Sequence, residues 1–153
     1  RDVIRSVAEM MRPRAQAGEV EIGIELPDAF PMLWADERAI RQILLNLVSN
    51  AIKFSSAGGC IRITAGTVTD GVALTVEDDG DGMSADILST ATEPFVQGSI
   101  KSFSEAGTGL GLAITKRLVN LRSGEIEISS ELGRGTTVAI TLPIGCRPEL
   151  RKN

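Results

Sequence analysis

The chain has 153 residues, of which 42% are apolar and 24% are charged, and its formal net charge is −4. This length and composition suit one globular domain and exclude a wholly disordered chain, while the acidic balance argues against a nucleic-acid backbone as the main partner. The chain contains no histidine, which excludes the commonest general base and the commonest zinc ligand.

The first third of the chain predicts a helix, a strand and a second helix. Apolar residues at helical spacing predict a short helix over residues 3–11 that stops before Pro13. Alternating apolar and acidic residues predict a strand over residues 20–26. Asp36 is a suitable N-cap for a long helix that runs through Phe54 without Gly or Pro.

This long helix carries an apolar stripe and a separate polar row. The apolar positions recur at i, i+3, i+4 and i+7, which predicts that they are buried. Asn46, Asn50 and Lys53 fall within roughly 60° of one another on a helix. Two carboxamides and an ammonium on one face suit a hard cation and phosphate charge. A solvated helix face has the same pattern, so the row alone leaves both interpretations open.

The middle of the chain predicts two strands over residues 60–68 and 72–77. They are expected to pair in antiparallel fashion through Asp70-Gly71, a dipeptide that favours a hairpin turn. An acidic, glycine-rich segment over residues 78–83 follows the second strand, and a short helix begins near Ser84.

The last third begins with residues 96–107, which have little periodicity and suit a mobile loop. Residues 107–112 are glycine-rich and open a helix that is expected to run to about Arg122. Two alternating strands are predicted over residues 125–130 and 136–142.

The glycines at 107, 109 and 111 are a weak signal by themselves, because small residues at such a junction often serve only close packing. A helix N-terminus does offer free backbone N–H groups to a phosphate. The spacing matches neither a Walker A loop nor the dinucleotide fingerprint, so a different nucleotide-binding architecture is indicated.

Five ordered segments together resemble the catalytic and ATP-binding domain of two-component sensor histidine kinases, and the combination is far more specific than any one glycine motif. They match the family's N, G1, F, G2 and G3 boxes in order, at residues 36–54, 78–83, 93–95, 107–112 and 133–136. The resemblance implies the Bergerat fold of the GHKL ATPases. This is an α+β, two-layer α/β sandwich with a mixed sheet and helices on one face.

The resemblance also implies roles for the matched residues. Asp78 would accept a hydrogen bond from the 6-amino group of adenine, with Thr136 helping directly or through water. Asn50 would hold Mg²⁺ with help from Asn46, and Lys53 would reach phosphate oxygens.

The other implied ATP-binding residues are Phe54, Gly80, Gly82, Met83, Lys101, Gly107, Thr108, Gly109, Leu110, Gly111 and Leu112. The ring of Phe54 would pack on adenine, although a core Phe also fits the sequence. Lys101 would be a second phosphate cation, although an exposed loop lysine fits as well. Glu77, Asp79 and Asp81 crowd Asp78 with negative charge and would raise its pKa if they point inward, or else they face solvent.

The implied activity is transfer of the γ-phosphoryl group of Mg-ATP to a histidine on a separate dimerisation domain, with a response regulator as a further partner. In the hydrolysing branches of the superfamily a glutamate precedes the metal-binding asparagine by one helical turn. Asn46 stands there and cannot accept a proton, so efficient intrinsic hydrolysis is not expected. Two other interpretations stay open, a nucleotide-binding pseudokinase that acts through partner proteins and a related serine-directed protein kinase.

No apolar stretch approaches the roughly 20 residues that span a bilayer. We therefore expect a cytoplasmic domain over residues 1–147, with a tail at 148–153 and no direct contact with membrane or nucleic acid. A parent protein anchored in a membrane is compatible with this expectation.

Overall fold

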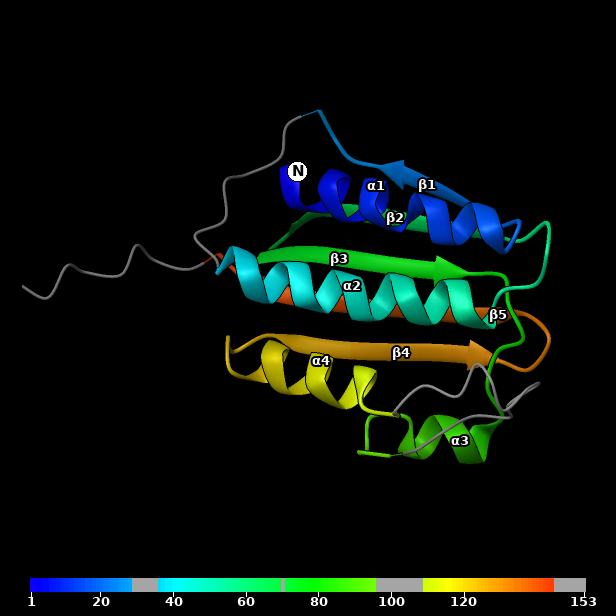
Figure 1. Ribbon diagram of the computed structural model, residues 1–153. Coiled ribbons are helices and arrows are strands. Elements are labelled where there is room, and N and C mark those ends of the chain that lie inside the picture. Colours follow the sequence, from blue (N-terminus) through cyan, green and yellow to red (C-terminus); the bar gives the residue numbers. More distant parts are fainter. Residues whose placement is uncertain (29–35, 70, 96–108, 145–153) are drawn as a thin grey trace, which may run out of the picture.

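The computed structural model describes residues 1–28, 36–69, 71–95 and 109–144. Within these ranges the helices and strands form two layers (Figure 1). In chain order the elements are α1 (Asp2–Ala17), β1 (Glu21–Glu25), α2 (Glu37–Phe54), β2 (Cys60–Val68), β3 (Gly71–Asp78), α3 (Ala85–Thr90), α4 (Gly111–Asn120), β4 (Glu125–Glu131) and β5 (Gly135–Pro143).

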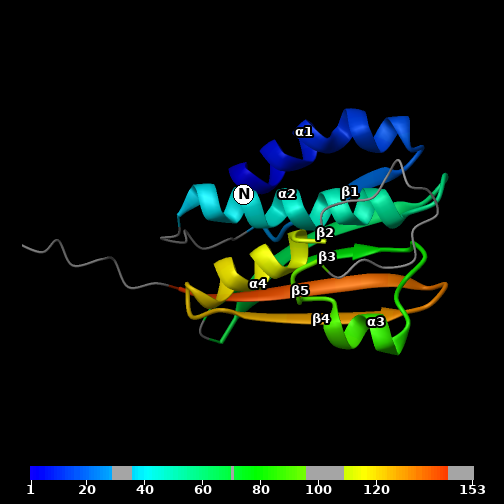
Figure 2. The same cartoon turned by 60° about the horizontal axis from the view of Figure 1, so that its bottom comes forward.

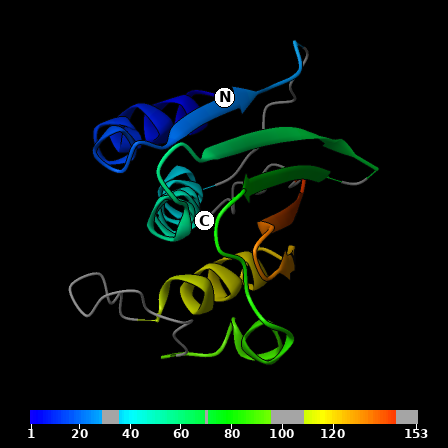
Figure 3. The same ribbon diagram turned by 90° about the vertical axis from the view of Figure 1, so that its right-hand side faces the viewer.

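The strands form one mixed sheet in the order β1-β2-β3-β5-β4. β1 and β2 are parallel, whereas β2–β3, β3–β5 and β4–β5 are antiparallel. Figure 3 shows the sheet nearly edge-on, with α1, α2 and α4 on one of its faces. The predicted α+β sandwich with helices on one face is confirmed.

The central helix is α2, and its apolar stripe faces the sheet. Asp36 caps the helix, because its side chain accepts a hydrogen bond from the backbone N–H of Arg38 at 3.0 Å. The buried stripe consists of Ala39, Ile43, Leu44, Leu47, Val48, Ala51 and Ile52. Figure 2 shows α1 beside α2 at one side of this layer and α4 along β4 and β5 at the other.

The prediction that the first helix stops before Pro13 is wrong, because α1 continues through Pro13 to Ala17. A proline inside a helix removes one backbone hydrogen bond and strains the preceding turn. Here Ala15, beyond the proline, is buried at 1% exposure. Packing of this last turn against the core offsets the cost of the proline, as tertiary contacts often override local preference.

The predicted hairpin turn is also partly wrong. Gly71 lies opposite Val68 as the first residue of β3, so it is not a central residue of the turn, and Asp70 lies outside the described residues. The last helix is shorter than predicted, from Gly111 to Asn120. Among the described helices, none has the length and apolar character that crossing a membrane requires.

Candidate functional site

A cavity of about 480 Å³ lies between α2, the ends of β3 and β5, and the start of α4. This volume falls within the range of roughly 300–1,000 Å³ that is common for small-molecule sites. Its apolar walls include Leu47, Ala51, Phe54, Met83, Leu112 and Val138. Its polar lining includes Asn50, Asp78, Asp81, Ser84 and Thr136.

Asp78 ends β3 and lies directly opposite Thr136 of β5, so both side chains enter the cavity from one edge of the sheet. One carboxylate oxygen, Oδ1, accepts a hydrogen bond from the backbone N–H of Gly80 at 3.0 Å. Burial raises the pKa of Asp78, and the charges of Asp79 and Glu77 add to that rise, while hydrogen bonds from the backbone N–H groups of Gly80 and Thr136 oppose it. The cavity therefore holds a partly buried acceptor that is costly to ionise without a partner.

The acidic neighbours of Asp78 do not all point inward. Asp79 Oδ1 accepts a hydrogen bond from the backbone N–H of Cys60 at 2.9 Å, at the start of β2. Glu77 lies 3.7 Å from the guanidinium of Arg62 on the exposed face of the sheet. Asp81, by contrast, lines the cavity. Asp81 therefore points inward but is not among the charges that raise the pKa of Asp78, whereas Asp79 and Glu77 make their contacts elsewhere and still raise it.

Two glycines let the loop after β3 pack tightly against the β4–β5 hairpin. Gly82 has φ +66° and Gly135 has φ +99°, backbone conformations that other residues rarely adopt. A Cβ at Gly82 would overlap the carbonyl of Glu131, and one at Gly135 would overlap the carbonyl of Asp78. The sequence analysis names Gly82 as a binding residue, and in the structure Gly82 lines the cavity in addition to this packing role.

The polar row of α2 divides among three environments. Asn50 lines the cavity. Asn46 faces α4, where its Nδ2 atom donates to the carbonyl of Gly111 at 3.3 Å and to Thr115 Oγ1 at 3.5 Å. The ammonium of Lys53 lies 4.9 Å from the ring centroid of Phe54, which lines the cavity. The row is therefore a functional candidate at Asn50 and a helix–helix contact at Asn46.

The start of α4 lies beside Asn50. A Cβ added at Gly111 would come within 3.3 Å of Asn50 Nδ2, which shows how closely the two helices approach there. The N-cap, Leu110, makes no side-chain capping bond, so the first-turn N–H groups have no side-chain cap. Gly109, with φ +67°, accepts a hydrogen bond from the backbone N–H of Phe95 through its carbonyl. Three predicted residues, Lys101, Gly107 and Thr108, lie outside the described residues.

Sequence reasoning missed several residues that line this cavity. Asp81, in the glycine-rich segment after β3, was considered only as a negative charge near Asp78 and not as a binding residue. Ser84, the N-cap of α3, and Ile87 of that helix also line it. Leu132 contributes from the β4–β5 turn, although it is 68% exposed and had no sequence signal.

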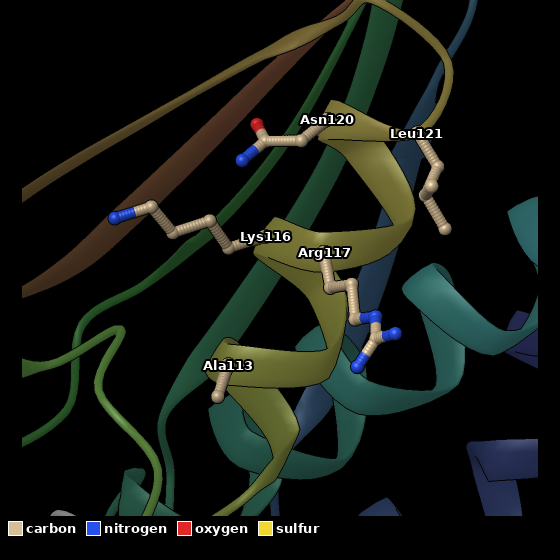
Figure 4. Close-up of a pocket in the computed structure, with 5 residues that line it drawn as sticks. All are labelled: Ala113, Lys116, Arg117, Asn120 and Leu121. Atoms are coloured by element: carbon tan, nitrogen blue, oxygen red, sulfur yellow. The ribbon is translucent and has the colours of Figure 1, made fainter.

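A second hollow lies on the outer surface of α4 and is formed by Ala113, Lys116, Arg117, Asn120 and Leu121 (Figure 4). The figure shows Lys116 and Arg117 pointing away from each other, and Lys116 donates to Thr92 Oγ1 at 3.1 Å. Four of the lining residues belong to α4 and the fifth, Leu121, is its C-cap, so this hollow lacks the converging walls of the cavity beside Asp78.

The side chains that line the cavity offer few ligands for a metal ion. Within the described part of the chain, no three His, Cys, Asp or Glu side chains gather as a metal cluster. Asn50 offers a carboxamide oxygen, a hard ligand suited to Mg²⁺, which usually keeps several waters and takes few protein ligands. Asn50 therefore fits as a single protein ligand of a magnesium ion that keeps several of its waters.

Comparison with protein families gives a match over residues 35–145 to the model described as "Histidine kinase-, DNA gyrase B-, and HSP90-like ATPase". The "Non-motile and phage-resistance protein" of Caulobacter vibrioides is 38% identical over 148 residues, which are 94% of this chain and 18% of the relative. "Histidine protein kinase DivJ" of the same organism is 35% identical over 97% of this chain and 25% of its own length. The chain thus spans a quarter or less of these relatives.

Solved structures agree with these sequence matches. The full-length protein ShkA, crystallised in complex with AMPPNP, is 36% identical with a TM-score of 0.83 over 95% of this chain and 30% of that one. The mycobacterial sensor histidine kinase MprB is 27% identical with a TM-score of 0.80 over 93% of both chains.

Proposed function

We propose that this chain, which belongs to the histidine kinase-, DNA gyrase B- and HSP90-like ATPases and matches the catalytic domain of sensor histidine kinases, binds Mg-ATP in the cavity beside Asp78. We further propose that it donates the γ-phosphoryl group to a histidine on a separate dimerisation domain. The observation that carries the proposal is the placement of Asp78 and Thr136 at one edge of a cavity that Asn50 also lines.

The base would lie at the sheet edge of the cavity. The carboxylate of Asp78 accepts hydrogen bonds, so it pairs with the 6-amino group of adenine and meets a repulsive carbonyl in guanine. Leu47, Ala51 and Val138 provide apolar surface for the ring. This arrangement favours an adenine nucleotide.

The phosphates would extend toward Asn50 and the first turn of α4. Backbone N–H groups at a helix N-terminus favour anions, and the carboxamide oxygen of Asn50 suits Mg²⁺. When bound, Mg²⁺ supplies neutralisation of phosphate charge during phosphoryl transfer. Lys53 supplies positive charge near Phe54, and Lys101, Gly107 and Thr108 remain proposed contacts in the segment that precedes α4.

The chain's own residues favour transfer over hydrolysis. Asn46 occupies the position one turn before Asn50, has no basic group, and donates its amide hydrogens toward Gly111 and Thr115. It therefore orients α4 and does not activate water. Because the chain has no histidine, the acceptor must come from another domain, and we propose a response regulator as the onward partner and the cytoplasm as the location.

A calorimetric titration tests the site directly. Non-hydrolysable analogues of ATP and GTP are each titrated into the domain with and without Mg²⁺, and we expect adenine-selective binding that Mg²⁺ strengthens. Absence of binding at millimolar nucleotide would contradict the proposal and favour a pseudokinase that acts through partner proteins. Phosphoryl transfer from labelled ATP to a histidine-bearing dimerisation domain, but not to serine in a test protein, then separates the histidine kinase from a serine-directed kinase.

A further inference from the structure

Ser130 lies on the edge strand β4, next to the cavity, and its hydroxyl connects three groups of the binding-site frame. Ser130 Oγ accepts a hydrogen bond from the backbone N–H of Met83 at 2.8 Å. It donates to the carbonyl of Gly135 at 2.9 Å. It also lies 2.9 Å from the hydroxyl oxygen of Thr136. One side chain therefore ties the loop after β3 to the start of β5.

The number of hydrogens in this network fixes the direction of its last bond. A serine hydroxyl has one hydrogen and two lone pairs. A carbonyl only accepts, so the hydrogen of Ser130 is used by Gly135. The bond between the two hydroxyls must then have Thr136 as its donor. The remaining lone pair of Ser130 takes the N–H of Met83, which leaves this hydroxyl fully used.

Thr136 consequently turns lone pairs, and not a hydrogen, toward the cavity that it lines. Asp78, directly opposite on β3, also presents an acceptor there. This edge of the cavity then offers acceptors on both strands. A ligand group with two hydrogens, such as an exocyclic amino group, satisfies both, whereas a carbonyl at the same place meets lone pairs. A water held by both acceptors donates to them and also turns its lone pairs toward an amino group.

We propose that Ser130 is a positioning residue that holds the Thr136 hydroxyl as a hydrogen-bond acceptor and thereby makes the site select 6-amino over 6-oxo purines. The inference rests on the proposed adenine-nucleotide function. The inference goes beyond that function, because it assigns the selection of 6-amino over 6-oxo purines to Ser130. This residue lies outside the five sequence motifs and does not itself touch the base. Without the Ser130 hydroxyl, the Thr136 hydroxyl is free to rotate and donate to a carbonyl.

The test compares non-hydrolysable triphosphates of adenosine and inosine, which differ in the 6-amino or 6-oxo group and in the proton on the adjacent ring nitrogen. Ser130→Ala is expected to lower the ratio of adenosine to inosine affinity about fivefold, the effect of one net hydrogen bond. Ser130→Thr keeps the hydroxyl and is expected to retain the wild-type ratio. Ser129→Ala is the matched control, because this neighbour is exposed.

A double-mutant cycle separates positioning from simple structural support. Thr136→Val removes the hydroxyl at nearly constant shape, and in that background Ser130→Ala is expected to change the ratio no further. A uniform loss of affinity for both nucleotides in Ser130→Ala would overturn the inference and leave the proposed function intact. If Ser130→Ala does not fold, Thr136→Val alone decides, since an unchanged ratio there also overturns it. A wild-type domain that binds neither nucleotide overturns the proposed function and this inference with it.

Discussion

Helices α1 and α4 pack on opposite sides of α2, and they are held there by different kinds of contact. α1 buries Ile4, Val7, Ala8, Met11 and Ala15 in the core. α4 buries only Thr115 and Val119 among its ten residues. Part of its contact with α2 is made by the carboxamide of Asn46 instead of apolar side chains.

This difference has a functional consequence, because local stability follows the density of buried apolar contacts. α1 packs along α2 and contributes five buried residues to the core that they share. α4 borders the cavity, and beside its two buried residues only the partly buried Leu112 and Leu118 pack against the core. We therefore expect α1 and α2 to unfold only with the whole domain and α4 to open locally.

The largest effect on the free energy of unfolding is expected when a side chain in the core shared by α1, α2 and the sheet is truncated. Leu44 has 0% exposure, and Leu44→Ala should lower the free energy of unfolding by about 2–5 kcal/mol through lost burial and a cavity. Ile114 of α4 is 40% exposed, and Ile114→Ala should cost less than about 1 kcal/mol. Urea unfolding of both variants measures the contrast. Equal losses would show that α4 belongs to the core as firmly as α2.

The second largest effect is expected on ATP affinity, when Asp78 is changed without loss of stability. Asp78→Asn places an N–H donor where the 6-amino group also donates, and removes a charge-assisted bond that contributes about 1.5–3 kcal/mol, so ATP affinity should fall about tenfold to a hundredfold. Glu77→Gln, an exposed neighbouring carboxyl, is the control. Calorimetric titration measures both, and unchanged affinity in Asp78→Asn would remove the base from this edge of the cavity.

The raised pKa of Asp78 adds a pH dependence with a defined sign. Because its folded pKa lies above the usual 3.8, the folded state binds this proton more tightly than the unfolded state does. The contribution of Asp78 to stability is therefore present below pH 3.8 and is lost as the pH rises through the folded pKa. The nucleotide-free Asp78→Asn variant should gain stability over wild type at pH 7 and lose that gain in acid. A pH series of urea unfolding curves checks this, with Glu125→Gln, an exposed carboxyl at the opposite end of the sheet from Asp78, as the control. A gain in stability that does not depend on pH would contradict the prediction.

The sequence predicted the core more completely than the site because the two depend on different kinds of information. The apolar spacing of α2 and the alternation of β4 are each a regular pattern within one element, and both elements lie within one residue of where they were predicted. The predicted end of the first helix before Pro13 was wrong because burial of Ala15, a tertiary contact, outweighs the tendency of proline to end a helix.

At the site, the motifs identified Asp78, Asn50 and Thr136, and all three line the cavity. They did not identify Ser130, whose role appears only when β4 places its hydroxyl beside Met83, Gly135 and Thr136. Nor did helical spacing distinguish Asn46 from Asn50. That distinction depends on where α4 crosses α2, and no pattern within one helix encodes that crossing.

The smallest effect expected is also the most direct test of the contrast between α1 and α4. Asn46→Ala removes two long hydrogen bonds, at 3.3 and 3.5 Å, between α2 and α4. Its cost should be about 1 kcal/mol or less and should appear as faster amide hydrogen exchange in α4 with little change in α1. Gln42→Ala is the control, because it removes the exposed bond to Asn46 Oδ1 and leaves the contacts with α4 in place. Exchange that rises equally in α1 and α4 would mean that the two helices open as one unit, and ligand binding would then have to order the whole helical layer instead of α4 alone.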